Sequence, residues 1–481
     1  MNPSFIIEPK LDFGTGQHVD IRFGLMNYHP LDVTSLVSPK KIKLGIVGTT
    51  KTIEGVINWL NKCKDGIPGK ESNQPNLFPP FPGFGEDSCF KSEFIIDQNF
   101  QRAISQRNID IITKAPTHKA IVEQAVQGFY SEIEYLAQNQ PVEVIICALP
   151  LELFSAMEQQ RVSSRESKAE DEPDSELDFH HLLKSKVMKL RIPIQLILPT
   201  TYDETAKIPR KLKKDSFRRV QDEATRAWNI HTALYYKARG IPWRLIRDSK
   251  DITSCYIGIS FYKTLDQKHI LTSIAQIFNE RGEGIIVRGG KVQLSKKDRQ
   301  IHLSHDDAFD LLDNTLQRYR EEHKNTPGRV VLHKSSSYSA EELEGFHQAA
   351  ASNRISSVDL INISEDSGTR LFRYGNYPPL RGTFLSLSEA KHLLYTRGSV
   401  EFFSTYPGMY IPSPLLIETA SVEQTPLYLA AEILALTKMN WNNTQFDGAL
   451  PITMRAARQV SKILKYVGEN DYIEPRYSFY M

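Results

Sequence analysis

Four polar residues between positions 180 and 237 have the types and spacing of an anion-binding pocket. His180 and Lys184 are four residues apart, so a helix would place both on one face. Gln195 follows on a predicted strand, and Lys237 lies at the end of a later predicted helix. An imidazole, an amide and lysine ammonium groups together suit a terminal phosphate, which accepts several convergent hydrogen bonds. The alternative is that His180 and Lys184 are exposed helix residues beside an acidic loop.

A second set of positions lacks the carboxylates that a metal-dependent nuclease would carry there. Two predicted strands and a helix could carry the carboxylates of a metal-dependent nuclease site (residues 255–263, 329–333 and 452–467). Two-metal phosphoryl transfer needs negatively charged ligands. The relevant positions instead hold Ser260, Ser335 and Arg458, with Ala457 before the arginine. The sequence therefore predicts a nuclease scaffold without its chemistry.

Other cations could follow a phosphate backbone. They are Lys211 and Lys214 in a basic run (206–219), and Arg373, Arg397 and Arg455 in the second half, where aromatic residues are interspersed. For each one, a salt bridge or a packing role is the alternative. The sequence contains no Gly-x-Ser-x-Gly elbow, no Walker A loop and no paired Cys/His zinc spacing, so it does not indicate these chemistries.

The bulk composition is that of an ordinary globular protein. The chain has 481 residues, 40% of them hydrophobic and 24% charged, with a net charge of +2. This length allows two to four domains, and the small net charge means that nucleic-acid binding would need cations concentrated in a channel. Four cysteines without CxxC spacing indicate reduced thiols in a cytoplasmic protein. No window resembles a signal peptide or a membrane span.

The elements that must position these residues fall into two halves. An apolar strand at 41–47, a Gly-containing turn and a helix at 53–63 are typical of the start of a doubly wound α/β domain. A helix at 122–137, strands at 142–148 and 192–198, and a helix at 220–236 follow. Residues 66–85, rich in Pro, Gly and aromatics, are predicted to form a long surface loop, and residues 161–178 a solvated loop.

The second half begins after Gly240, a predicted helix end. Strands come first and helices later, which fits an α+β layer with a mixed sheet. Residues 371–374, 382–387 and 390–396 are predicted to form a β-meander. At the amino end, Phe13-Gly-Thr-Gly16 reads as a tight turn with no helix pattern after it.

Several longer motifs are shared with one known family. They include Asn229-Ile-His-Thr-Ala-Leu-Tyr-Tyr-Lys-Ala-Arg-Gly-Ile-Pro-Trp-Arg244, Cys255-Tyr-Ile-Gly-Ile-Ser260, Arg370-Leu-Phe-Arg-Tyr-Gly375, Pro379-Leu-Arg-Gly-Thr383, Tyr395-Thr-Arg-Gly398 and Lys438-Met-Asn-Trp-Asn-Asn443. Taken together, they resemble a short prokaryotic Argonaute made of MID and PIWI domains, and the resemblance covers nearly the whole chain. It implies an α/β fold with a Rossmann-like MID domain (38–240), an RNase H-like PIWI domain (241–481) and N-terminal strands (1–37) that pack on PIWI.

The resemblance also implies roles for the candidate residues. His180, Lys184, Gln195 and Lys237 match the family's pocket for the 5′ phosphate of a guide. In many members Mg²⁺ links that phosphate to the C-terminal carboxylate, which Met481 would supply here, with Gln195 as a further ligand. Ser260, Ser335 and Arg458 depart from the acidic tetrad of cutting members, so the resemblance implies guided binding without cleavage.

Inactive short Argonautes work with a partner that joins an APAZ region to an effector. The implied partners are therefore a small guide RNA with a 5′ phosphate, complementary single-stranded DNA from an invader, and an APAZ effector protein, with no membrane. A sirtuin-like NADase is favoured for the effector and a TIR NADase is the alternative. The implied role is antiviral and antiplasmid defence by abortive infection through NAD depletion. A guided metal-dependent nuclease with an unusual site and a protein-only scaffold remain as other hypotheses.

Overall fold

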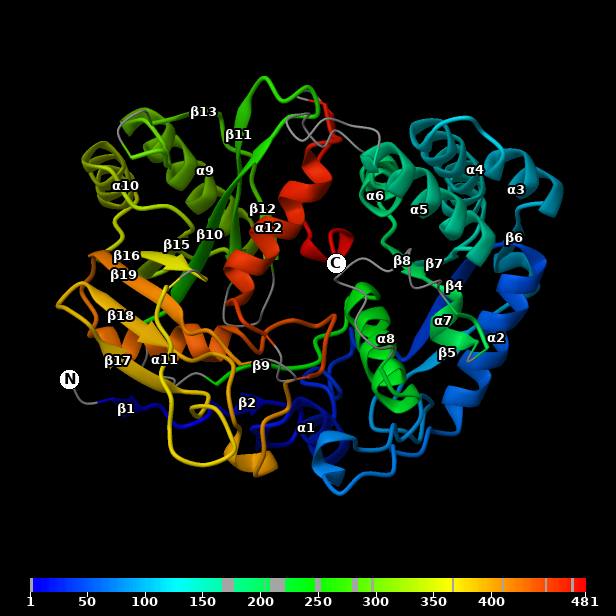
Figure 1. Ribbon diagram of the computed structural model, residues 1–481, viewed down its shortest axis with the longest axis horizontal. Coiled ribbons are helices and arrows are strands. Elements are labelled where there is room, and N and C mark those ends of the chain that lie inside the picture. Colours follow the sequence, from blue (N-terminus) through cyan, green and yellow to red (C-terminus); the bar gives the residue numbers. More distant parts are fainter. Residues whose placement is uncertain are drawn as a thin grey trace. The chain divides into compact units, whose positions relative to one another are not determined.

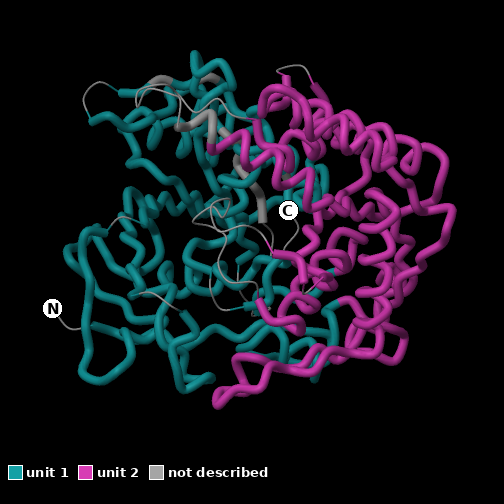
Figure 2. Tube along the Cα trace, turned by 45° about the vertical axis from the view of Figure 1, so that its right-hand side comes forward, with its two compact units in different colours: residues 1–31, 241–465, 475–481 teal, residues 32–240, 466–474 magenta. Residues whose placement is uncertain are grey.

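A computed structural model describes residues 3–166, 177–203, 205–207, 221–246, 252–278, 284–295, 298–365, 367–408, 411–445, 448–468 and 471–481. The chain forms two compact units (Figure 2). Unit 1 comprises Met1–Leu31, Ile241–Lys465 and Pro475–Met481, and unit 2 comprises Asp32–Gly240 and Tyr466–Glu474. The chain thus passes from unit 2 to unit 1 after Gly240 and returns briefly to unit 2 near its end.

Unit 2 is built on a parallel sheet of five strands in the order β5-β4-β7-β8, with β6 also paired to β4. The strands are β4 (Lys41–Gly48), β5 (Glu93–Ile95), β6 (Gln101–Ala103), β7 (Val144–Ala148) and β8 (Ile194–Ile197). The central strands β4 and β7 are almost wholly buried, as expected when helices cover both faces of a parallel sheet. This is the predicted Rossmann-like arrangement.

The helices of unit 2 occupy the stretches between these strands. They are α2 (Thr50–Lys64), α3 (Gln106–Thr113), α4 (His118–Asn139), α5 (Leu151–Glu166), α6 (Phe179–Val187), the one-turn α7 (Pro199–Tyr202) and α8 (Glu223–Lys237). Helices α3 to α6 share one apolar core with β7 and β8. Figure 1 shows these four helices grouped on one side of the sheet. Because α5 continues to Glu166, the prediction of a solvated loop from residue 161 was wrong for its first six residues.

Most of residues 68–76 in the Pro/Gly-rich segment 66–85 are exposed, as predicted for a surface loop, whereas the aromatic end of the segment packs inward. Phe81 and Phe84 are buried, and the Phe81 ring meets the ring of Trp228 on α8 edge-on at 5.1 Å. The indole N–H of Trp228 donates to the carbonyl of Pro80 at 3.0 Å. Proline and glycine made the backbone irregular, while the aromatic side chains between them still gained free energy by leaving water.

Unit 1 contains the second large sheet. Its central strands run in the order β13-β11-β10-β15-β16, in which β10, β15 and β16 are parallel and β11 is antiparallel to β10. The strands are β10 (Ser254–Lys263), β11 (Ile270–Phe278), β12 (Gly284–Ile286), β13 (Lys291–Leu294), β14 (Ile301–His302), β15 (Arg329–Lys334) and β16 (Ser357–Ser364). Three antiparallel strands followed by two parallel ones match the predicted RNase H-like arrangement.

Helices lie on both faces of β10. Cys255, Ile257 and Ile259 share a core with α9 (His305–His323) and α10 (Ala340–Ser352). Gly258 points to the other face, where a Cβ atom would lie 2.1 Å from the carbonyl oxygen of Thr453 on α12 (Ile452–Leu464). Successive side chains of β10 point to opposite faces of the sheet, as in any pleated strand. Glycine at position 258 allows α12 to approach the backbone of β10 closely.

The remaining strands of unit 1 extend or flank this sheet. They are β1 (Ser4–Phe5), β17 (Thr383–Ser386), β18 (Lys391–Leu394) and β19 (Leu415–Ser421), while β2 (Leu11–Asp12), β3 (Gln17–His18) and β9 (Arg244–Leu245) form a small sheet. Helix α11 (Pro426–Leu436) follows β19. Residues 371–374 form no strand, so the predicted meander lacks its first member.

The N-terminal segment of unit 1 contains a helix that the sequence did not predict. Helix α1 (Ile21–Tyr28) begins at Asp20, whose side chain accepts the backbone N–H groups of Arg22 and Phe23. Glu8 then ties the segment to the rest of the unit through ion pairs with Arg381 at 2.8 Å and Lys438 at 3.2 Å. The four cysteines are free and buried, and no helix in the described part of the chain has the length and apolarity of a membrane span.

Candidate functional site

Helix α6 presents the first two residues of the predicted pocket. The helix begins at Asp178, whose carboxylate accepts the backbone N–H of His181 at 3.0 Å, an arrangement that caps the helix. Its apolar side chains join the core of unit 2 and so fix which face turns inward. His180 and Lys184 lie one turn apart, and the Lys184 side chain is only 2% exposed.

Strand β8 and helix α8 supply the other two residues. Gln195 lies on β8, an edge strand of the sheet, and Lys237 is the last residue of α8. The Lys237 Nζ donates to the Gln195 Oε1 at 2.7 Å, and the Gln195 Nε2 donates to the carbonyl of Leu196 at 3.1 Å. Lys237 is 3% exposed. One hydrogen bond therefore joins two elements that are 42 residues apart in the chain.

Electrostatics shows that His180, Lys184 and Lys237 share one neighbourhood, and the hydrogen bond from Lys237 adds Gln195 to it. Burial, followed by the positive charge of Lys237, lowers the pKa of Lys184 well below its usual value. Burial also lowers the pKa of Lys237 to about 7. The pKa of His180 is lowered by burial first and then by the charge of Lys184, with Lys237 adding to the effect. The structure thus brings His180, Lys184, Gln195 and Lys237 together, although their role remains a prediction.

This arrangement favours an anion. Both lysines have a lowered pKa, so each holds its own proton weakly. A negative ligand would stabilise the charged form of both. Asp178, His180 and His181 also have potential metal-ligating atoms within 4.8 Å of one another. However, the Asp178 carboxylate already accepts the His181 Nδ1 at 3.0 Å, and His180 feels the charge of both lysines. Without a bound phosphate, a cation at this cluster would be repelled by the same lysine charges that attract the phosphate.

The other predicted contact residues that the structure describes all lie in unit 1. Met481 ends unit 1 and follows the 3-10 turn Tyr477–Phe479. Arg373 lies on an exposed loop, Arg397 lies after β18 and Arg455 lies on α12, all in unit 1. Lys211 and Lys214 lie outside the described residues.

Two of the positions expected for nuclease carboxylates follow a paired position of the sheet. Strands β10 and β15 are parallel, and Ile259 is paired with Lys334, the last residue of β15, so Ser260 on β10 and Ser335 just after β15 come next along the chain. Ser260 is buried and Ser335 is exposed. On α12, Ala457 is buried, and Arg458 forms an ion pair with Glu365, which follows β16.

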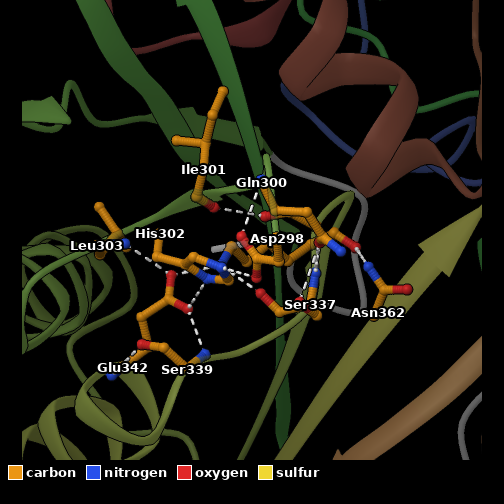
Figure 3. Close-up of polar contacts among 11 residues, drawn as sticks. Asp298, Gln300, Ile301, His302, Leu303, Ser337, Ser339, Glu342 and Asn362 are labelled. Carbon is orange, nitrogen blue, oxygen red and sulfur yellow. Dashed lines mark hydrogen bonds and ion pairs between the residues drawn. The ribbon is translucent and has the colours of Figure 1, made fainter. Parts of the chain in front are cut away.

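A polar network surrounds the end of β15 (Figure 3). Lys334, just before Ser335, forms an ion pair with Glu342, and both side chains are fully buried. The second carboxylate oxygen of Glu342 lies 3.2 Å from the His302 Nδ1, and the His302 Nε2 lies 2.7 Å from Asp298. Gln300 accepts the backbone N–H of Ser337 at 2.6 Å. These acids lie near the predicted nuclease edge, and each is bound by a cation or an imidazole.

The sequence prediction missed this network. One signal was present, because Ser339-x-x-Glu342 has the spacing of a capping box, and the structure contains that box at the start of α10. The burial of Lys334 against Glu342 had no comparable signal, since it depends on how α10 packs on the sheet.

No family model matches the sequence, and no curated protein is similar to it. Solved structures are similar in fold. Clostridium butyricum Argonaute bound to a guide DNA and a 19-mer target DNA superposes with a TM-score of 0.66 at 15% identity, over 98% of this chain and 54% of that one. A. aeolicus Argonaute gives a TM-score of 0.58 at 15% identity, and Aa-Ago with externally bound siRNA gives 0.56 at 16%, each over 99% of this chain and 54% of the other.

The chain therefore spans about half the length of these Argonautes, and its α/β fold is theirs. The predicted pair of a Rossmann-like and an RNase H-like domain is confirmed as the fold class. Identities near 15% carry the likeness no further than the fold.

Proposed function

We propose that this chain is a guide-binding protein that holds the 5′ phosphate of a short nucleic-acid strand in the pocket of unit 2. The observation that carries the proposal is the convergence of His180, Lys184, Gln195 and Lys237 from three separate elements. Buried lysines are costly to a fold unless an anion or a proton shift relieves their charge. A phosphate monoester is a dianion near neutral pH and accepts several such donors at once.

The proposed function is binding without cleavage. Ser260 and Ser335 carry no charge, and the nearby carboxylates are already engaged: Glu342 with Lys334, Asp298 with His302, and Glu365 with Arg458. A metal ion at this edge would have to compete with these partners for each carboxylate. This argument also disfavours the alternative of a nuclease that uses unrecognised acids.

The donor set is compatible with Mg²⁺ beside the guide phosphate. The Gln195 amide oxygen accepts a hydrogen bond from Lys237 and retains a second lone pair, and amide and carboxylate oxygens are ligands that Mg²⁺ takes. In the proposal, the Gln195 amide oxygen would be one ligand of the ion. When bound, the ion would supply positive charge to the phosphate oxygens. The lysines of this chain bind and orient the same group.

The proposed biological role follows from binding without cleavage. A protein that binds a guide RNA paired with complementary invader DNA, but does not cut the DNA, needs another protein to supply an enzymatic response to that pairing. We assign that action to an APAZ effector, with a sirtuin-like NADase preferred over a TIR NADase, in abortive-infection defence. Base pairing would supply sequence specificity, while the protein holds the backbone.

The binding proposal is tested by comparing guides that differ only at the 5′ end. A labelled 20-mer RNA with a 5′ phosphate should bind the full chain at least about tenfold more tightly than the same RNA with a 5′ hydroxyl. The double variant H180A/K184A should lose this difference, whereas K186A, which changes an exposed lysine of α6, should retain it. Equal affinity for the two RNAs would exclude the pocket, and no binding of either RNA would favour a scaffold that binds only protein.

The absence of cleavage is tested separately. The guide-loaded chain, with Mg²⁺ or Mn²⁺, should leave a paired DNA target intact, and S260D should behave in the same way. Metal-dependent cutting that S260A leaves unchanged would point to an unrecognised nuclease site. In the proposal, coexpression with an APAZ effector protein should give NAD loss only when the complementary DNA is added.

A further inference from the structure

An exposed loop of unit 1 carries an unusual concentration of aromatic side chains. Phe372, Tyr374 and Tyr377 are 78%, 105% and 42% exposed. Across the described residues, exposed aromatics otherwise occur singly, at Phe5, Tyr135, Tyr428 and Tyr472. Three within six residues therefore form a local apolar surface that the fold does not use, and such surfaces mark interaction sites.

The backbone of this loop is anchored although its rings are exposed. The Leu371 N–H donates to the hydroxyl of Tyr395 at 2.7 Å, and the Tyr395 side chain is itself buried. The Arg373 guanidinium donates to the Tyr377 carbonyl at 3.2 Å and to the Ser399 hydroxyl at 3.3 Å. Phe372 and Tyr374 thus alternate with anchored residues. Rings held outward in this way lose less conformational entropy when they bind a partner.

The charge of the loop restricts the kind of partner. Arg370 and Arg373 alternate with the aromatic residues, and no aspartate or glutamate occurs between Ser367 and Ser388. The acid that precedes this stretch among the described residues, Glu365, is paired with Arg458. A guanidinium group binds phosphate well, and an aromatic ring stacks on a base of any sequence. Flat rings and arginines without carboxylates fit an unpaired nucleic-acid strand better than a mixed-charge protein surface.

We propose that residues 370–377 bind single-stranded nucleic acid, with Phe372 and Tyr374 stacking on bases and Arg370 contacting the backbone. Arg373 holds the loop in its binding shape. The proposal deepens the proposed function, because it provides a place where the chain contacts an unpaired stretch of the target strand. It differs from the phosphate pocket in what it recognises: bases exposed on a single strand, without regard to the chemistry of the 5′ end.

The test uses the full chain and a fluorescent dT20 strand with a 5′ hydroxyl, which the phosphate pocket does not favour. The variant F372A/Y374A should weaken dT20 binding by at least about thirtyfold, the lower range of what two lost stacking contacts cost. F372Y/Y374F, which keeps both rings, should bind like the parent chain. The matched control is L36A/V37A, because Leu36 and Val37 are also exposed apolar residues, at 103% and 84%, but lie in unit 2.

Two further measurements separate the possible outcomes. A dT20 strand that contains 5-iodouracil should crosslink to Phe372 or Tyr374, as mapped by mass spectrometry. Unchanged dT20 binding by F372A/Y374A, with crosslinks elsewhere, would overturn the proposal, and so would loss of a copurifying protein without loss of dT20 binding. If the phosphate pocket is wrong, the parent chain should instead bind 5′-phosphate and 5′-hydroxyl RNA with equal affinity. F372A/Y374A should not change the ratio of these two affinities.

Discussion

Binding of a 5′-phosphorylated guide should weaken as the pH rises above 7. Lys237 has a pKa of about 7 in the free protein because it is buried, and the pKa of Lys184 is also well below its usual value. A bound phosphate dianion would raise the pKa of both lysines, so the complex would take up protons. Binding that takes up protons becomes weaker as the pH passes upward through the pKa of the free group.

The magnitude follows from Lys237 alone. At pH 7 about half of the free protein carries the Lys237 proton, and at pH 8.5 only about 3% does. If the phosphate raises the pKa of the complex well above 8.5, the dissociation constant should rise by about fifteenfold between these two pH values. The phosphate, whose second pKa is about 6, is already a dianion at pH 7 and does not offset this change. Lys184 acts in the same direction, so fifteenfold is a lower limit.

The assay is fluorescence anisotropy with one RNA sequence that carries either a 5′ phosphate or a 5′ hydroxyl, from pH 7 to 8.5 at constant ionic strength. The ratio of the two dissociation constants removes pH effects on the rest of the interface. Lys237→Met should weaken phosphate binding at pH 7 and flatten the profile, whereas Lys186→Met should leave both unchanged. A ratio that stays constant within twofold, or that rises with pH in favour of the phosphate, would refute the reasoning.

Three further predictions concern stability, each measured by urea denaturation of the single variants. Glu342→Ala leaves Lys334 buried without its carboxylate and should cost about 3–5 kcal/mol, whereas Glu341→Ala, on the exposed side of the same helical turn, should cost much less. Gly258→Ala places a Cβ 2.1 Å from the Thr453 carbonyl and should cost about 1–3 kcal/mol or more. Gly85→Ala, with no atom within 4 Å, serves as its control. Phe81→Ala should cost about 3–5 kcal/mol if the segment is packed as described, and a cost no larger than that of Phe78→Ala would contradict the burial of that segment.

Much of the fold was predictable because long apolar patterns dominate it. The strands around Ile46, Ile146 and Ile257 and the long helices α4 and α9 have clear periodicity, and all appear in the structure. Shorter elements were less predictable. Helix α1 has only eight residues, including Gly24, so its helical pattern is weak, and its cap at Asp20 was the available signal. Residues 371–374 have strand-like composition, but no neighbouring strand pairs with them.

The pocket was predictable only in its local part. The spacing of His180 and Lys184 places them on one helical face whatever the tertiary fold, since residues four apart are neighbours on a helix. The hydrogen bond between Lys237 and Gln195 depends on the docking of α8 against an edge strand, and the burial of both lysines depends on the whole of unit 2. Composition and spacing do not specify these distances. The family resemblance indicated which four residues form the pocket, while the distances and the pKa shifts became apparent only with the structure.

The charge balance at the end of β15 bears on what this edge of unit 1 can hold. Lys334 offsets Glu342, and Arg458 offsets Glu365, while Ser260 and Ser335 add no charge. A divalent metal binds where negative charge exceeds positive charge, because ionic ligands must offset the free-energy cost of removing its water. These two pairs leave no such excess, and the remaining acid of the network, Asp298, is bound to the His302 imidazole. By the same reasoning, a phosphate backbone could pass this edge without strong repulsion, as the proposed binding without cleavage requires.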